Sequence, residues 1–369
     1  MQRAKLFSSR NDLLDLTFVS KSLHDFHRLF AETGFDMDES MPLLGCKKLF
    51  QHLWHQSPVT LFFVVFWSDC ILVRLLSLLR LRRLRVVLWI QGSLPDESFM
   101  RHRSRLRRTI LMAGEFVSLL SCTVAMVVSS EEADLLCTRY GSWVRSRVVV
   151  LPNLVWADAL PKDAAQAAAK ALGQRVTFAY VGSVGVWQNF DVMLALYAAI
   201  DAALRQRGRQ STLRVVVPAS HRGLAERIVQ QHGLPERPEL LSCQPAGIAA
   251  ALVGVDLGFL LRDDSIVNQV ASPLKLRDYL RAGVRVVASG KIGVLRDVPE
   301  LESSGLVLRV SWADLESNLA LVAERLCTEI LRRCAEPFPW EVLTESFTCE
   351  AWMSATGVGD ALRRRLAAD

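Results

Sequence analysis

The feature that most constrains the fold is a repeated alternation of wholly apolar runs with helical patterns. Helical patterns lie near residues 23–33 and 70–84, and a basic helical pattern follows residue 90. The apolar runs read as strands, at LDLTFVS (14–20), TLFFVVF (60–66), RVVLWI (85–90) and VAMVVSS (124–130). Strands that are apolar on both sides belong to a parallel sheet with helices on both faces. The first half therefore predicts a Rossmann-like domain.

The same alternation restarts in the second half of the chain. One more strand, RVVVLPNLV (147–155), precedes the alanine-rich DALPKDAAQAAAKALG (158–173). Strands then recur at RVTFAYVGS, TLRVVVP, ELLSCQP, VDLGFLL and LVLRV, separated by helical patterns. A chain of 369 residues is long enough for two cores. We expect domains over 1–155 and 174–335, joined by a linker at 156–173, and a helical segment at 336–369 that packs back on the first domain.

The distribution of charge argues against an integral membrane protein. Asp69 and Arg74 interrupt the most apolar stretch, residues 58–90, before it reaches the ~18 to 20 apolar residues that a membrane span needs. The opening MQRAKLFSSRND has no apolar core of the kind a secretory signal contains. We therefore expect a cytoplasmic protein.

Cysteine and histidine usage gives little sign of a metal or disulfide framework. The eight cysteines are scattered without a CxxC pair, which predicts reduced, packed thiols. His24 with His27, and His52 with His55, have helical spacing, but no third ligand is placed with either pair. We expect no metal and no cofactor.

Two arginine clusters account for much of the net charge of +6. Their members are Arg80, Arg82, Arg83 and Arg85, and then Arg101, Arg103, Arg105, Arg107 and Arg108. A solvated helix face explains such clusters as well as an anionic lipid surface, a phosphorylated ligand or a nucleic acid does. Nucleic acid ranks last, because few aromatic residues interleave with the arginines for base stacking.

The segment ASPLKLRDYLRAGVRVVAS (271–289) carries the first candidate site. Ser272 and Pro273 have the side chains typical of a helix start. Amides at such a start form an anion site, and Lys275 adds a formal charge beside them. Asp278 lies on the same short helix, where a carboxylate can accept two hydrogen bonds from a ribose diol. The alternative is an ordinary capped helix with two surface charges.

A second loop strengthens the ligand hypothesis. In FAYVGSVGVWQN, Gly182 and Gly185 follow a strand and precede a helix, so backbone can approach a phosphate closely. The spacing does not match GxGxxG, so it does not predict a dinucleotide site.

These two segments resemble the C-terminal domain of glycosyltransferase family 4 enzymes, which have the GT-B fold, especially the bacterial enzymes of capsule and exopolysaccharide assembly. The motifs that carry the resemblance are YVGSVGVWQN (180–189) and LLRDDSIVNQVASPLKLRDYLRAG (260–283). It spans about residues 147–289. In the first domain only the pattern agrees, through WIQGSLPDES (89–98), the VVSS strand end and the LPN before the linker.

The resemblance implies a retaining transferase of a surface polysaccharide pathway, with its nucleoside diphosphate sugar held mainly by the second domain. It implies that Lys275 and Arg262 stabilise the leaving diphosphate. The other donor contacts that it implies are Gly182, Ser183, Gly185, Gln188, Asn268, Ser272, Pro273 and, for the ribose, Asp278. The first domain would bind a glycan or lipid-linked acceptor near Gln91, Asp96 and Glu97, and its basic helices, including residues 70–84, would dock at the inner membrane face.

The chain departs from the family pattern at several positions. Ser183 and Gln188 stand where many relatives have an arginine and a lysine. Val270 replaces the acid eight positions before Asp278, and Gln91 stands where relatives often place a histidine. The first domain also lacks the usual glycine-rich opening loop. These departures keep a second hypothesis open, a GT-B-like protein that binds nucleotide or glycan without turnover.

Overall fold

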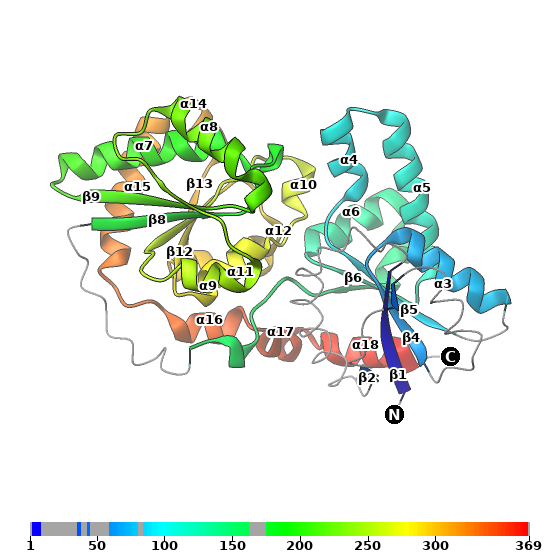
Figure 1. Ribbon diagram of the computed structural model, residues 1–369. Coiled ribbons are helices and arrows are strands. Elements are labelled where there is room, and N and C mark those ends of the chain that lie inside the picture. The colour runs from blue at the N-terminus through cyan, green and yellow to red at the C-terminus, as the bar shows by residue number, and fades with distance from the viewer. Residues whose placement is uncertain are drawn as a thin grey trace. The chain divides into compact units, whose positions relative to one another are not determined.

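The structure is a computed structural model that describes residues 2–8, 35–37, 43–44, 59–79, 84–161 and 175–367 (Figure 1). It divides into two compact units, one of Met1–Pro152 with Trp352–Asp369 and one of Asn153–Ala351. Some sequence predictions lie outside the described residues: the strand at 14–20, the helix at 23–33, most of the alanine-rich segment, and Arg80, Arg82 and Arg83.

The first unit contains a parallel sheet in the order β2-β1-β4-β5-β6-β7, with β3 beside β1. Its described strands are β1 (Gln2–Ser8), β2 (Phe35–Met37), β3 (Leu43–Leu44), β4 (Val59–Val64), β5 (Arg85–Ile90), β6 (Val124–Val127) and β7 (Val148–Val150). The pattern predicted β4 to β7 correctly. It missed β1, because Arg3 and Lys5 break up the apolar run on which the prediction depended.

Helices α3 (Trp67–Leu79) and α5 (Arg105–Ser121) lie side by side in the first unit (Figure 1). Gly114 of α5 fits against Trp67, since a Cβ there would come within 2.7 Å of the indole ring. Arg74 of α3 donates to the carbonyl of Ser121 at 2.7 Å. Because both contacts advance by seven residues along each helix, the two helices run parallel. Helices α4 (Leu94–His102) and α6 (Ser130–Tyr140) follow β5 and β6.

The end of the chain belongs to the first unit. After α16 (Trp340–Ser346) and α17 (Cys349–Thr356), helix α18 (Val358–Ala367) contacts β6 and β7. The indole of Trp352 donates to the carbonyl of Val150 at 3.0 Å, and Arg365 donates to that of Val148 at 2.6 Å. From Trp352 onward, the predicted C-terminal segment packs back on the first domain as expected, whereas residues 336–351 belong to the second unit.

The second unit has a parallel sheet in the order β10-β9-β8-β11-β12-β13. Its strands are β8 (Arg175–Val181), β9 (Gln210–Val216), β10 (Glu239–Leu241), β11 (Leu257–Leu260), β12 (Arg285–Ser289) and β13 (Val307–Val310). Its helices are α7 (Phe190–Gln206), α8 (Arg222–His232), α9 (Ile248–Ala251), α10 (Ile266–Gln269), α11 (Leu274–Arg281), α12 (Gly293–Asp297), α13 (Glu300–Ser303), α14 (Trp312–Ser317) and α15 (Leu319–Cys334). The prediction of an α/β chain with two Rossmann-like sheets is confirmed.

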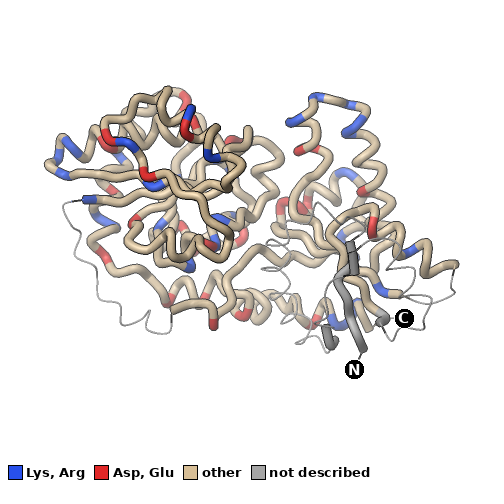
Figure 2. Tube along the Cα trace, in the orientation of Figure 1, with Lys and Arg blue, Asp and Glu red and all other residues tan. Residues whose placement is uncertain are grey.

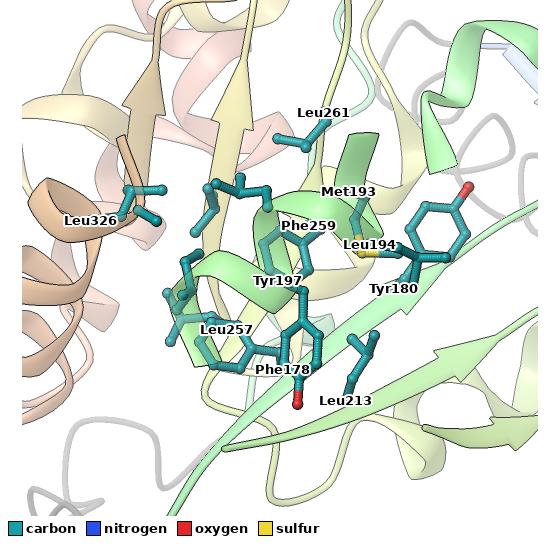
Figure 3. Packing of buried hydrophobic residues seen from close by; sticks show 14 of the residues in the cluster. Phe178, Tyr180, Met193, Leu194, Tyr197, Leu213, Leu257, Phe259, Leu261 and Leu326 are labelled. Atoms are coloured by element: carbon teal, nitrogen blue, oxygen red, sulfur yellow. The ribbon is translucent and has the colours of Figure 1, made fainter. Parts of the chain in front are cut away.

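The core of the second unit holds its two central strands together (Figure 3). Phe178 of β8 stacks on Phe259 of β11, with ring centroids 5.4 Å apart, and Tyr197 of α7 meets Phe178 edge-on at 5.6 Å. Burial of each such ring stabilises the fold by roughly 1.5 to 3 kcal/mol. This packing positions the site. Because β8 and β11 are adjacent parallel strands, the loops that follow their carboxyl ends start side by side.

Among the described helices, none is long and apolar enough to cross a bilayer. The described residues include seven cysteines, of which Cys70, Cys122, Cys327 and Cys349 are buried. Burial raises the pKa of the Cys122 thiol to about 12, so this side chain is an inert part of the core.

Candidate functional site

The loop after β8 requires glycine at its first position. Gly182 has φ +135°, a value that side chains rarely tolerate. A Cβ there would also lie 3.3 Å from Nζ of Lys275. The amide of Gly182 donates to the carbonyl of Val216 at 3.0 Å, which anchors the start of the loop to β9. Gly182 therefore brings bare backbone next to a buried cation.

Two hydrogen bonds hold the rest of this loop before α7 begins. The hydroxyl of Tyr180 donates to the carbonyl of Ser183 at 2.7 Å, and the amide of Val184 donates to Nδ1 of His221 at 3.3 Å. Asn189 then adopts a left-handed conformation with φ +49°. No side chain caps α7, and Nδ2 of Asn189 is buried without a hydrogen-bond partner. The first-turn amides of α7 thus lack a side-chain acceptor.

The second loop leads into α11, where the predicted helix start needs a correction. The helix does begin at this point, but Pro273 is the cap residue and Ser272 makes no capping bond. The hydroxyl of Ser272 instead accepts from the amide of Asn153 at 2.9 Å, and its carbonyl accepts from Nδ2 of Asn153 at 2.5 Å. Ser272 does not cap the helix because it is bonded instead to Asn153, the first residue of the second unit.

Lys275 is the central residue of the site. Its side chain is buried, its Nζ donates to Oε1 of Gln188 at 2.6 Å, and it lies 4.4 Å from the ring centroid of Tyr180. Burial, and secondarily the charge of Arg262, lowers the pKa of Lys275 well below its usual value. Within the described residues no carboxylate forms an ion pair with it. A buried cation with only neutral partners is stabilised when an anion arrives.

Arg262 brings a second cation to the same place. The side chain is buried, and its Nη1 donates to the carbonyl of Trp187 at 2.9 Å and to Oδ1 of Asn268 at 3.3 Å. Asn268 is oriented in turn by Oδ1 of Asp263, to which its amide donates at 2.5 Å. Arg262 and Lys275 therefore reach the glycine-containing loop at adjacent residues, and the structure brings the two predicted loops together.

Tyr279 was not predicted, although it fixes α11 to the sheet. Its buried hydroxyl accepts from the amide of Val181 at 2.8 Å and lies 3.3 Å from the carbonyl of Ala179. A Cβ on Gly258 would come within 2.6 Å of the Tyr279 ring. Glycine inside an otherwise apolar strand was the available signal, since it marks a close approach by another group.

The remaining donor-side candidates lie in the two loops and on α11. Asp278 and Pro273 are half-buried on and before α11, and Gly185 is half-buried in the first loop. Val270, at the position of the missing acid, is fully buried. Their roles toward a ligand stay predictions.

In the first unit, Asp96 is an anchor for its neighbours. Its carboxylate accepts from Ser93 and Arg139 and pairs with Arg108 at 2.8 Å. Burial by itself raises the pKa of Asp96, but the hydrogen bonds from Ser93 and Arg139 and the nearby charges bring the pKa below its ordinary value. Glu97 is half-buried, and Nε2 of Gln91 is buried without a hydrogen-bond partner.

Glu132 is a buried acid that sequence reasoning missed. It is 1% exposed, its Oε2 accepts from the amide of Val128 at 3.0 Å, and its own amide donates to Ser129 at 3.1 Å. Burial raises the pKa of Glu132 well above its usual value. The signal was present, because Ser129 and Glu132 have the spacing of a capping box.

Within the part of the chain that the structure describes, no group of three histidine, cysteine or acidic side chains is placed to hold a metal. The two histidine pairs, at residues 24 and 27 and at residues 52 and 55, lie outside it.

No protein-family model matches the sequence, and no curated protein matches it. Solved structures do match. Sucrose-phosphate synthase from Thermosynechococcus elongatus superposes with a TM-score of 0.67 at 16% identity, covering 100% of both chains. HepE of Anabaena, solved in complex with UDP and glucose, has a TM-score of 0.65 at 13% identity and the same coverage. The fold is GT-B.

A third GT-B neighbour is the lipopolysaccharide outer core galactosyltransferase WaaB, with a TM-score of 0.61 and 11% identity over 99% of each chain. Identities this low establish only the fold. Any function of this GT-B chain must therefore be inferred from its own site residues.

Proposed function

We propose that this GT-B chain is a glycosyltransferase. It moves a sugar from a nucleoside diphosphate sugar to a glycan or lipid-linked acceptor, with retention of configuration, in the synthesis of a surface polysaccharide on the cytoplasmic side of a membrane. Its fold and the pair of buried cations in its second unit support this proposal. The second unit holds the donor, and the first unit receives the acceptor.

The observation that carries the proposal is the burial of Lys275 and Arg262 against one glycine-containing loop. Departure of a nucleoside diphosphate develops negative charge on the leaving oxygen. Fixed donors in a site sheltered from water stabilise that charge more strongly than water does. Two desolvated cations therefore favour the transition state over the ground state, which is how binding becomes catalysis.

Backbone amides complete the donor site in this proposal. Gly182 places backbone without a side chain next to Lys275, and Ser183 and Gly185 supply further loop backbone for a diphosphate. The first turns of α7 and α11 add amides that favour an anion. Asp278, one turn beyond Lys275, takes the ribose hydroxyls, and Asn268 helps to orient Arg262 toward phosphate or sugar.

Retention of configuration requires no protein nucleophile here. The leaving phosphate can itself accept the proton of the acceptor hydroxyl. In the first unit, Asp96 is committed to Arg139 and Arg108, so Gln91 and Glu97 are the better candidates for orienting an acceptor. Proton NMR of the product tests retention through the anomeric configuration.

The first experiment is a thermal-shift series with UDP, GDP, ADP and CMP, followed by assay of donor hydrolysis with the best nucleotide. UDP comes first because HepE, of the same fold, was solved with it. We expect one nucleoside diphosphate to raise the melting temperature and its sugar conjugate to be slowly hydrolysed. No shift with any diphosphate would remove the basis of the proposal.

A second candidate function is binding without turnover. Val270 is fully buried at the position where family 4 enzymes place an acid, and Ser183 and Gln188 carry no charge. A stabilising nucleotide shift with neither donor hydrolysis nor sugar transfer would favour this candidate over catalysis.

A further inference from the structure

Helix α5 exposes an apolar stripe along its length. The exposed residues Leu106 and Ile110, 72% and 56% accessible, begin a stripe that continues through Ala113, Val117 and Leu120. At 100° per residue, these five side chains fall within an arc of about 80°. An ordinary surface helix presents polar residues on this side. Within the described part of the first unit, the stripe residues stay exposed and are not part of the core.

The opposite face of α5 already supplies the contacts that the fold needs. Leu119 is buried in the core, and Gly114 fits against Trp67 of α3. Polar groups on that face are satisfied locally, because the hydroxyl of Ser118 donates to the carbonyl of Glu115 at 2.7 Å. The buried face of α5 is therefore its less apolar face, and the stripe is exposed to solvent.

Helix α3 extends the apolar surface. Leu75, Leu78 and Leu79 at its C-terminal half are exposed, the last by 79%. Arg74 on the same helix is bonded to Ser121, one residue past the end of the stripe, so the leucines of α3 lie near its C-terminal end. The two helices lie side by side (Figure 1). Each of them exposes apolar side chains to solvent.

Arginines surround the N-terminal end of the stripe (Figure 2). Arg105 and Arg107 flank Leu106 on both sides of the helix. Arg101 lies in the last turn of α4, and Arg103 is the residue that ends α4. From residue 98 to residue 130 the sequence contains one acid, Glu115, which is buried. The exposed surface of this segment is thus cationic around an apolar centre.

We propose that this α5 surface, made of the stripe, the α3 leucines and Arg101, Arg103, Arg105 and Arg107, docks on a bilayer that contains anionic lipid. Apolar side chains enter the interface by roughly 5 to 10 Å while arginine stems follow them and keep their charges at the headgroups. This assignment does not depend on the proposed transfer activity. The sequence predicted docking by the basic helices, including residues 70–84. In the present proposal α5 is the main docking helix.

The charge pattern favours lipid over the other occupants. In a two-fold contact between two such α5 surfaces, residues 98–130 of the second copy would offer no exposed acid to pair with these arginines. A nucleic acid would match the charge but would leave the five stripe residues in water.

The experiment is co-sedimentation of the full chain with phosphatidylcholine vesicles, with and without phosphatidylglycerol. We expect binding to the mixed vesicles, weakened by salt. The double variant L106E/I110E should lose it, and each of R103S and R105S should weaken it about fivefold. L321E, which alters an exposed leucine of the second unit, is the matched control and should bind normally.

Three results would overturn the proposal. The first is equal vesicle binding by L106E/I110E and the unaltered chain, with circular dichroism confirming that both are folded. The second is a dimer in light scattering that the same double variant dissolves, which would assign the stripe to a second copy. The third is tight oligonucleotide binding without any vesicle binding.

Discussion

The amine of Lys275 donates to Oε1 of Gln188 at 2.6 Å, and this bond joins α11 to the loop after β8. Gln188 is a neutral partner for Lys275, whereas a lysine at position 188 would place a second positive charge beside the buried amine of Lys275. Lys275 comes from α11, and the loop contributes its neutral acceptor.

Replacement of Lys275 tests the leaving-group role. Lys275→Ala should lower kcat/KM for transfer or donor hydrolysis by an amount equivalent to ~2 to 4 kcal/mol, as loss of a charge-stabilising contact does. Arg281→Ala, on the exposed side of the same helix, is the control and should leave the rate unchanged. Turnover by the Lys275 variant close to that of the unaltered chain would refute the role.

The depressed pKa of Lys275 gives binding a pH dependence. A bound diphosphate favours the protonated amine, so binding should take up protons, and nucleotide affinity should fall as the pH rises through the lowered pKa of Lys275. Titration calorimetry in buffers of different ionisation enthalpy measures the uptake. Lys275→Met should abolish it, and an identical uptake in that variant would assign the proton elsewhere.

The same group makes stability depend on pH. Between the lowered pKa of Lys275 and the usual value near 10.4, the unfolded chain binds the extra proton, so its contribution to the free energy of unfolding rises with pH. Urea unfolding over this window should show a steeper rise for the unaltered chain than for Lys275→Met. Parallel curves would contradict the assignment.

Asp278 should bind the ribose. Asp278→Ala should weaken nucleotide affinity while the melting temperature without ligand stays nearly the same, because the side chain is only half-buried. Calorimetric titration with the preferred nucleotide measures the loss. Unchanged affinity would count against this role.

Asn153 should control the geometry of α11 through Ser272. Asn153→Ala removes the bond from Nδ2 to the Ser272 carbonyl and should raise KM for the donor more than it lowers kcat. Asn153→Asp is the informative partner, since it keeps the size of the side chain but removes the donor. Normal KM in both variants would show that the contact only supports the fold.

Tyr279 should matter for stability before it matters for binding. Tyr279→Phe leaves the buried amide of Val181 without its acceptor and should lower the free energy of unfolding by about 1 to 3 kcal/mol. Denaturant unfolding of both chains measures this difference in the free energy of unfolding. A change well below that range would mean that another group replaces the hydroxyl.

Periodicity predicted most described strands after the first, because a strand buried on both faces must be apolar throughout. The pattern did not predict strand β1, since Arg3 and Lys5 interrupt its apolar run. Both loops of the candidate site were also recognisable, because glycine after a strand and proline before a helix are local requirements of the backbone. These features depend on neighbours in sequence, and so the sequence alone determined them.

Partners across the chain were decided only by tertiary structure. Nothing local indicates that Ser272 would bond Asn153, that Asp96 would be committed to Arg139, or that Gln188 would accept from Lys275. The last two pairs follow strands that are adjacent in a sheet but distant in sequence. Tertiary packing also determined which face of α5 is buried, and the apolar stripe lies on the other, exposed face.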